Sequence, residues 1–545
     1  MSAYLHAVRR RRQAVAATAD RVDARIGLAV VAAASIGAFA IESVAWRTTA
    51  GRNLTFYLSY YLDMAHRHPV LPTLMLTIKP LPAIVFGPLL QFTGATGTTI
   101  ACALMYAVSI SAYTAIAARL FDRLVAGCAA VALLLYPPYA ALFHQPSGDA
   151  LFAFAMSLWG LLLVRLVERP SYRLIAWQAP AVFLLVMTRT ANQMLAVVAL
   201  CPLLLIALPW RRRLLLTGAL VAAVAVGVLA VDVYDGARYG DYTSSRTANA
   251  NFPLYRVFAF DHLVTPSNGP ATRELARAVQ NDLLQRQPYK AYHVTLNEFF
   301  ADASPRFWSD LVLLSDRTWG WNSNYTKLRA VAIEAIRAHP RAYAHDVYRS
   351  VLDQFSEPVF TGVAQAPAKT PPGPAATVVV DGRKLPQPSE GQPIPAANMD
   401  WTLATPHQTI TMDWSSISHP VVRFADPALA KRDAHIVARR NALLAKLGNA
   451  NGSPSLARLL NRIEHLYPPL WAWLLVGALG FAIRRPRGAA GMFTLLLVAL
   501  TVVVGSAVGQ PFTPAYRIPF DPIFILFGIA GVLAPAGEKP GGATV

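Results

Sequence analysis

The chain has 545 residues, of which 54% are hydrophobic and 14% charged, and a mean hydropathy of +0.37; these values exclude an ordinary soluble globular protein. Its net charge of +19 does not indicate nucleic-acid binding, because the arginines stand between apolar runs and no basic stripe with interleaved aromatic residues occurs. All three cysteines lie inside apolar runs, which predicts neither a disulfide nor a zinc site. The composition predicts an all-α polytopic membrane protein.

Ten segments are candidates for membrane crossing, since a spanning helix needs about 20 apolar residues. They lie near residues 26–45, 98–118, 124–143, 150–167, 173–189, 191–208, 213–232, 466–483, 488–508 and 519–535. If each crosses once, the arginine-rich flanks all fall on one side, whereas residues 136–149 on the other side contain no Lys or Arg. The positive-inside rule then places both termini in the cytoplasm, with the chain in the plasma or inner membrane.

This topology divides the chain into five parts. They are a cytoplasmic tail (1–25), an N-terminal transmembrane module (26–232) with a first external loop (46–97), an extracytoplasmic region (233–465), a C-terminal transmembrane module (466–535) and a cytoplasmic tail (536–545). Apolar residues at helical spacing in 272–287, 328–338, 340–355 and 426–447 predict a mainly helical external domain. The Pro and Ala content of 365–397 predicts a flexible or extended linker.

The first external loop begins with an amphipathic pattern. Phe56, Tyr57, Tyr60, Tyr61 and Met64 recur three or four residues apart, which predicts a helix lying on the membrane surface. Five prolines between residues 69 and 88 then favour a re-entrant or surface-lying element.

Acidic residues near the external surface are the candidates for a base or a metal ligand. Glu42 and Asp63 are the only acids in or beside the first loop, and each has a structural role as its alternative. Asp149 opens a span, where a carboxylate also caps a helix N-terminus.

Three cations at the same depth are candidates for anion binding, because charged groups persist in membranes only with a partner or a function. Arg189 lies in a short turn, where it either pairs with Asp149 or Glu42 or binds an anionic ligand. Arg517 presents a planar fork that suits phosphate oxygens, with snorkelling to lipid headgroups as the alternative. Lys79 is either a second phosphate contact or an ordinary interfacial lysine. The sequence has neither a glycine-rich phosphate loop nor a GxSxG motif, so it does not support nucleotide hydrolysis or serine-esterase chemistry.

Four stretches, taken in order, carry a family resemblance. They are HPVLPTLMLTIKPLP, YPPYAALFHQPSGDALFAFAMSL with LLVMTRTANQ, AIRAHPRAYAHDVYRSVLDQF, and AYRIPFDPIFILF. This order resembles the GT-C superfamily of polyprenyl-phosphate-sugar-dependent glycosyltransferases, which includes protein mannosyltransferases and aminoarabinose transferases acting on lipid A. The resemblance implies transfer of a sugar from a polyprenyl-phosphate donor to a glycan, lipid or protein acceptor at the external membrane face.

In that reading Arg189, Arg517 and Lys79 stabilise the departing phosphate, and the loop helix holds the acceptor through Tyr57, Tyr60, Tyr61 and His66. A carboxylate removes the acceptor proton. Direct displacement with one such base predicts inversion at the anomeric carbon.

The first loop departs from the family pattern. Such enzymes usually carry an acid soon after the first span, but WRTTAGRNLTF contains no carboxylate. Either Glu42 or Asp63 has taken over, or Asn53 serves by hydrogen bonding, or the protein is inactive; a divalent cation is a further possible component. The competing functions are a transporter or flippase for a lipid-linked saccharide and a catalytically silent scaffold in envelope assembly.

Overall fold

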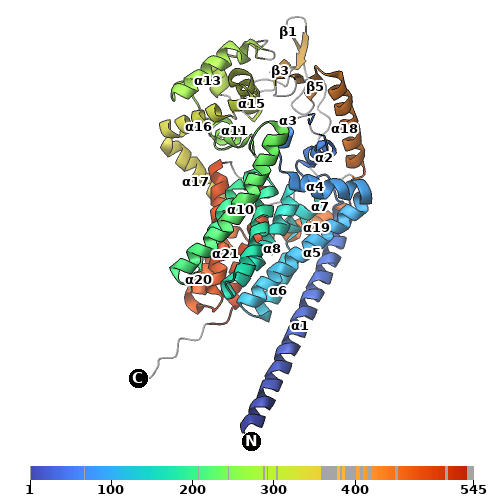
Figure 1. Cartoon of the computed structure of the whole chain (residues 1–545), viewed down its shortest axis with the longest axis vertical. Coiled ribbons are helices and arrows are strands. Elements are labelled where there is room, and N and C mark those ends of the chain that lie inside the picture. Colours follow the sequence, from blue (N-terminus) through green and yellow to red (C-terminus); the bar gives the residue numbers. More distant parts are fainter. Residues whose placement is uncertain are drawn as a thin grey trace.

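The structure is a computed structural model of the whole chain. It describes residues 2–536 with gaps at 67, 71, 206–207, 244, 287–288, 291, 302–304, 324, 358–376, 381–382, 387–399, 405–408, 415–419, 449–451 and 510–513. A bundle of long helices forms one end of the molecule, and the described residues between α10 (Trp210–Tyr239) and α20 (Leu470–Arg484) form most of the other (Figure 1).

Five helices of the described chain are long and apolar enough to cross a membrane, or six if the bent pair α6 (Arg123–Leu134) and α7 (Pro137–His144) counts as one. The five are residues 25–45 of α1 (Ser2–Ala45), residues 80–120, α8 (Gly148–Glu168), α10 and α21 (Ala489–Gly509). Residues 80–120 combine α4 (Pro80–Pro88), η1 (Leu89–Thr93) and α5 (Gly94–Leu120). The chain is therefore a helical membrane protein.

The prediction of about ten spans is not confirmed. Four of the predicted runs form apolar helices of only 10–17 residues: α9 (Tyr172–Met187), part of η2 (Thr190–Leu204), α20 (Leu470–Arg484), and η5 (Ile518–Phe520) with α23 (Asp521–Leu533). Leu135 and Tyr136 separate α6 from α7, which begins at Pro137, and the two helices meet at an angle of 58°. Prolines begin new helices here because they cannot continue a preceding one.

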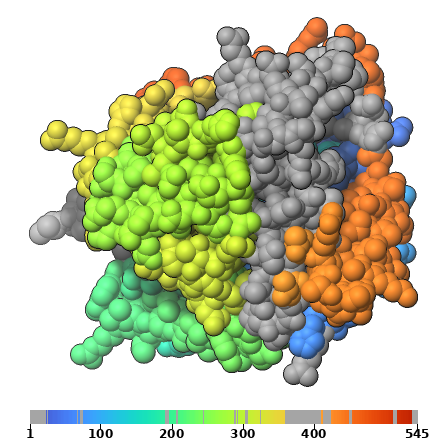
Figure 2. All heavy atoms as spheres, turned by 90° about the horizontal axis from the view of Figure 1, so that it is seen from above, coloured from blue at the N-terminus to red at the C-terminus, as the bar shows by residue number. Residues whose placement is uncertain are grey.

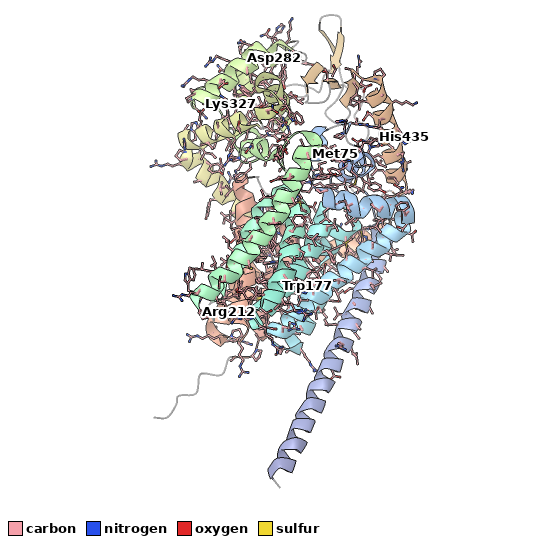
Figure 3. The ribbon with its side chains drawn as sticks, viewed as in Figure 1. Met75, Trp177, Arg212, Asp282, Lys327 and His435 are labelled. Carbon is pink, nitrogen blue, oxygen red and sulfur yellow. The ribbon has the colours of Figure 1, made fainter. Side chains whose placement is uncertain are left out.

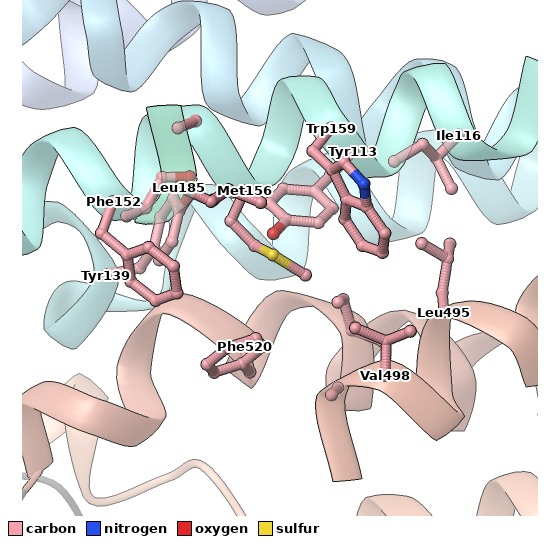
Figure 4. Close-up of a cluster of buried hydrophobic side chains, with 14 of the residues drawn as sticks. Tyr113, Ile116, Tyr139, Phe152, Met156, Trp159, Leu185, Leu495, Val498 and Phe520 are labelled. Atoms are coloured by element: carbon pink, nitrogen blue, oxygen red, sulfur yellow. Dashed lines mark hydrogen bonds between the residues drawn. The ribbon is translucent and has the colours of Figure 1, made fainter. Parts of the chain in front are cut away.

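The bundle core joins helices from both membrane modules (Figure 4). Tyr113 of α5, Tyr139 of α7 and Trp159 of α8 are fully buried or nearly so. Leu495 and Val498 of α21 join the same cluster, as does Phe520 of η5. Residues more than 300 positions apart therefore share one hydrophobic core, which fixes the late segments against the early ones.

Arginine-rich segments gather at one end of the bundle, which we call the arginine end. Figure 3 shows Trp177 and Arg212 there, far from Met75, Asp282 and His435. At this end Arg119 Nη1 lies 2.9 Å from Glu168 Oε2, and Arg123 Nη1 lies 3.7 Å from Asp23 Oδ2. We call the opposite end the domain side. The assignment of the arginine end to the cytoplasm stays a prediction.

Short helices form most of the domain side. They are α11 (Ala248–Asn251), α12 (Leu254–Ala259), α13 (Pro270–Asn281), η3 (Leu283–Gln285), α14 (Leu296–Ala301), α15 (Pro305–Trp319), η4 (Trp321–Ser323), α16 (Thr326–Ala338) and α17 (Pro340–Ser356). Their own core includes Leu275, Phe299, Leu311 and Val331. Seen from above, these helices form a mass on one side, and α18 (Pro427–Ala445) lies on the other (Figure 2). The α19 helix (Pro454–Glu464) then leads back to α20.

Two small antiparallel sheets correct the all-α prediction. One pairs β1 (Thr377–Val380) with β2 (Arg383–Pro386), and the other has the order β3 (Asp400–Ala404), β4 (Thr409–Trp414), β5 (Pro420–Phe424). Their sequences are rich in Val and Thr, which favour strands, but the surrounding prolines hid this signal. Thus β1 and β2 fall inside the predicted linker 365–397, the rest of which lies outside the described residues; of the predicted tail 536–545, only Ala536 is described.

The first loop contains α2 (Leu54–Asp63) and α3 (Pro72–Thr77). The prediction that α2 lies on the membrane surface is wrong, because Leu54, Leu58 and Tyr60 are buried inside the protein. The α2 helix packs against α4 and α18 instead. Residues from Pro80 onward, which the predicted loop 46–97 includes, begin the long apolar stretch 80–120. The bounds of the loop stay a prediction.

Candidate active site

The turn between α7 and α8 presents a carboxylate at the domain side of the bundle. Ser147 caps α8, and its Oγ accepts a hydrogen bond from the Asp149 backbone nitrogen at 3.3 Å. A Cβ atom added to Gly148 would lie 2.6 Å from the Thr188 carbonyl oxygen and 2.8 Å from Tyr57 Oη. Only glycine therefore lets α8 approach both α2 and the end of α9 this closely.

Asp149 forms an ion pair with Arg189, the residue that precedes η2. The two residues are 6% and 7% exposed. The Arg189 guanidinium carbon also lies 4.2 Å from the centre of the Tyr516 ring. Three segments far apart in the sequence thus meet at one point.

Arg52 approaches the same tyrosine from the first loop. Its guanidinium carbon lies 5.4 Å from the Tyr516 ring centre, and its Nη2 is 3.4 Å from Tyr516 Oη. A Cβ atom at Gly51 would lie 2.6 Å from the Gln145 carbonyl oxygen, so the loop packs directly on the α7–α8 turn. Tyr516 therefore holds two guanidinium groups close together, which like charges would otherwise oppose.

A cavity of about 500 Å³ opens beside these groups. Residues of the transmembrane modules supply its apolar wall, including Phe152, Leu195 and Val502. The first loop and the domain-side helices supply polar groups, which are Arg52, Asn53, Tyr57, Thr77, Asn249, Asn251 and Arg329. Arg189 and Tyr516 also line it. The cavity thus joins an apolar wall to a strongly basic one.

The charges around the cavity are unbalanced. Arg52, Arg189 and Arg329 line it, and no carboxylate does so among the described residues. Arg52 and Arg329 are exposed, and neither forms an ion pair with another described residue. Burial, followed by the charge of Asp149, raises the pKa of Tyr57 to about 12, so this phenol stays protonated at neutral pH. The arrangement favours an anionic ligand with an apolar part.

Four predicted site residues gather here: Asp149, Arg189, Asn53 and Tyr57. Asn53 precedes α2 with φ of 62°, a left-handed conformation that asparagine tolerates better than most residues. Their roles in a reaction stay predictions.

Arg517, predicted to bind phosphate, lies elsewhere. It is 3% exposed, and its Nη1 donates to the carbonyl oxygens of Gln354 and Glu357 at 2.8 and 2.7 Å. Its Nε lies 3.2 Å from Asp521 Oδ1. These bonds tie the end of α17 to the start of α23, so the guanidinium is used within the protein.

Lys79 also lies away from the cavity, although Thr77 and Ile78 line it. It is 1% exposed, and burial lowers its pKa to about 8 in spite of the nearby carboxylates of Asp235 and Asp232. Its charge therefore faces α10 and not the candidate site.

The two acids in or beside the first loop do not line the cavity either. Glu42 is buried beside His144, with Oε2 and Nε2 3.6 Å apart. Asp63 accepts a hydrogen bond from the Val70 backbone nitrogen and lies 3.6 Å from both His66 and Arg432. Burial raises the pKa of Asp63, and the bond from Val70 and the charge of Arg432 oppose this shift.

Of the four residues predicted to bind the acceptor, only one lines the cavity. Tyr60 is buried with Tyr239, and Tyr61 Oη donates to Gln91 Oε1 at 2.9 Å. Together with His66, both lie outside the cavity lining, which leaves Tyr57 as the acceptor candidate at the site.

Tyr516 and two of the three lining arginines, Arg52 and Arg329, were not predicted as site residues. Tyr516 stands next to the predicted Arg517 and Arg52 next to the predicted Asn53, so a sequence signal existed one position away. For Arg329 the sequence contained no such signal, because an arginine on an amphipathic helix is usually a solvated surface residue.

No metal centre is evident: in the part of the chain that the structure describes, no three His, Cys, Asp or Glu side chains come together. Divalent cations such as Mg²⁺ prefer oxygen ligands, and Asp149, already paired with Arg189, is the carboxylate next to the cavity. These residues do not fit a divalent cation.

Comparison with known proteins gives one result to report. No family model and no curated protein matches the chain. Among solved structures it is similar to ArnT from Cupriavidus metallidurans bound to undecaprenyl phosphate, with 12% identity over 92% of this chain and 77% of that chain and a TM-score of 0.31. A TM-score at this level does not assign the chain to a fold or a family.

Proposed function

We propose that this protein is a membrane glycosyltransferase that moves a sugar from a polyprenyl-phosphate donor to an acceptor at the external face of the membrane. The observation that carries the proposal is the cavity, in which apolar side chains of the bundle meet three arginines. A polyprenyl phosphate has the matching chemistry, with a hydrocarbon chain next to an anionic phosphate. The order of the four GT-C-like stretches along the sequence supports a sugar as the transferred group.

In this proposal the donor phosphate binds Arg52 and Arg189 beside Tyr516. Guanidinium groups match phosphate oxygens in pairs of hydrogen bonds. They also stabilise the charge that develops on the phosphate as its bond to the sugar breaks. The apolar wall formed by Leu195 and Val502 accommodates the first isoprene units.

Asp149 serves as the base, in place of the acid that the stretch WRTTAGRNLTF lacks. The phosphate competes with Asp149 for Arg189, which frees the carboxylate to receive a proton. The acceptor hydroxyl oxygen then attacks the anomeric carbon while the bond to the phosphate oxygen breaks, its electron pair leaves with the polyprenyl phosphate, and the hydroxyl proton passes to Asp149. A single displacement of this kind inverts the anomeric configuration.

The test uses the full-length protein in liposomes with a radiolabelled polyprenyl-phosphate sugar and a mixture of envelope acceptors. We expect label to move from the donor to an acceptor, and R189Q to abolish the movement. If label instead crosses the bilayer on an intact donor, the protein is a transporter. A protein that binds the donor but neither transfers nor moves it is a scaffold.

A further inference from the structure

Residues 452–466, which include α19, lie against the domain-side end of α1. The Ser453 backbone nitrogen donates to the Val44 carbonyl oxygen at 2.7 Å, and Lys446 Nζ donates to the carbonyl oxygens of Leu90 and Gln91 at 3.0 and 3.2 Å. Leu460 of α19 packs with Ala45 and Trp46. Since α1 and residues 80–120 are both candidate spans, residues 446–448 and 452–466 lie against the domain-side ends of both.

Segment 446–466 and the neighbouring residues of α1 and η1 expose large apolar side chains and cations. Leu466 is 78% exposed, Phe92 75%, Val44 59% and Leu459 51%. Four exposed basic residues accompany them, which we call the basic rim: Arg47, Lys446, Arg458 and Arg462.

The charge of the basic rim is not neutralised within the protein. Arg47, Arg458 and Arg462 form no ion pair with another described residue. Glu464 is the one carboxylate in 446–466, and it is 5% exposed. Topology does not explain these cations either, since the positive-inside rule accounts for those at the arginine end.

We propose that the basic rim binds the headgroups of anionic glycerophospholipids in the leaflet on the domain side. Arginine and lysine at this depth place their alkyl stems in the hydrocarbon and their charged ends among the phosphates. Leu459, Leu466 and Phe92 insert between the acyl chains beside them. Clustered cations at a membrane surface attract anionic lipids. This binding surface is separate from the cavity, which none of its residues lines, and it does not depend on the proposed sugar transfer.

The experiment compares the full-length protein in nanodiscs of phosphatidylcholine alone and in nanodiscs that also contain phosphatidylglycerol. We expect phosphatidylglycerol to raise the Tm of the wild type and added salt to reduce the shift. The variant R47Q/R458Q/R462Q should lose most of the shift; Lys446 is kept because it bonds the Leu90 carbonyl. The control R273Q/R277Q/R337Q removes three exposed arginines of α13 and α16. This variant should keep the Tm shift caused by phosphatidylglycerol.

An equal phosphatidylglycerol shift in the rim variant overturns the proposal. It is also overturned if inorganic phosphate added to phosphatidylcholine nanodiscs reproduces the shift, because the site would then be an ion site. As a readout that needs no variant, photoactivatable phosphatidylglycerol should cross-link wild-type residues 446–466. Cross-links confined to other segments contradict the proposal even if the triple variant fails to fold.

Discussion

The Asp149 carboxylate is paired with the Arg189 guanidinium, and this pair joins the first turn of α8 to the junction of α9 and η2. Both side chains are nearly buried. Removing one partner of a buried pair typically costs about 3–5 kcal/mol, because the other charge stays behind without compensation. Arg189 nevertheless faces the cavity, so a second anion has access to it. The pair is thus a structural link and, in the proposed mechanism, the site where a ligand phosphate exchanges with a carboxylate.

We expect Asp149→Asn to lower sugar transfer about 100-fold to 10,000-fold, the usual contribution of a general base. The amide cannot accept the proton of the acceptor hydroxyl, although it retains the shape of the side chain. Donor binding by the folded protein should persist, since Arg52 and Arg189 remain, although the uncompensated Arg189 charge lowers the Tm. The measurement is transfer rate together with retention of the labelled donor.

Asp122→Asn is the matched control. Asp122 caps α6 at the arginine end, where its Oδ1 accepts from the Val125 nitrogen at 2.8 Å. The Asn amide oxygen can still accept this bond, so the substitution should change stability little and leave transfer unchanged. Full activity in Asp149→Asn would exclude Asp149 as the base.

Tyr516 should act through its ring. Tyr516→Phe keeps the surface that both guanidinium groups approach and loses only the 3.4 Å contact with Arg52 Nη2. Tyr516→Ala removes the ring, so the two arginines repel each other and spread apart. We expect the alanine variant to raise the KM for the donor at least tenfold and the phenylalanine variant to change it little. Equal effects of the two substitutions would assign the role to the hydroxyl.

Gly148→Ala tests how closely α8 approaches its neighbours. The new methyl group would lie 2.6 Å from the Thr188 carbonyl oxygen and 2.8 Å from Tyr57 Oη. These distances are too short for a carbon atom, so the Thr188 backbone or α8 must shift. Overpacking of this kind costs about 1–3 kcal/mol, and here it also displaces Asp149 from Arg189. We expect a lower Tm and weaker transfer. Gly127→Ala, with nothing within 4 Å of its added Cβ, should lower neither.

The sequence predicted the membrane class and several helices of the domain side, because long apolar runs and amphipathic spacing are local signals. Predicted helices 328–338 and 340–355 correspond closely to α16 and α17. The site was harder to predict. Arg189 and Arg517 both stand beside apolar runs, so the sequence does not distinguish them. Only the packing of α17 shows that the Arg517 guanidinium donates to the carbonyl oxygens of Gln354 and Glu357.

Arg517→Gln should therefore act on stability. It removes the bonds to Gln354 and Glu357 and leaves the fully buried Asp521 without its cation. A change of this type costs about 3–5 kcal/mol. We expect a much lower Tm and loss of the folded protein from detergent extracts. If the variant had the wild-type Tm but no transfer activity, Arg517 would be assigned to donor binding instead.

Lys79 gives a pH dependence whose sign follows from its burial. Its pKa in the folded protein is about 8, below the ordinary value of 10.5. Between these values the unfolded chain binds more protons than the folded one, so the contribution of Lys79 to the free energy of unfolding rises with pH. Below pH 8 the buried charge lowers stability, and above about pH 10.5 this cost is gone.

Lys79→Met removes the titrating group and keeps an apolar side chain of similar length. We expect the stability of the wild type relative to this variant to increase from pH 8 to pH 10, measured by denaturant unfolding in detergent. Subtracting the variant cancels the titration of groups that both proteins share. A difference that stays constant over this range would mean that Lys79 keeps an ordinary pKa in the folded protein, with its charge compensated by Asp235 and Asp232.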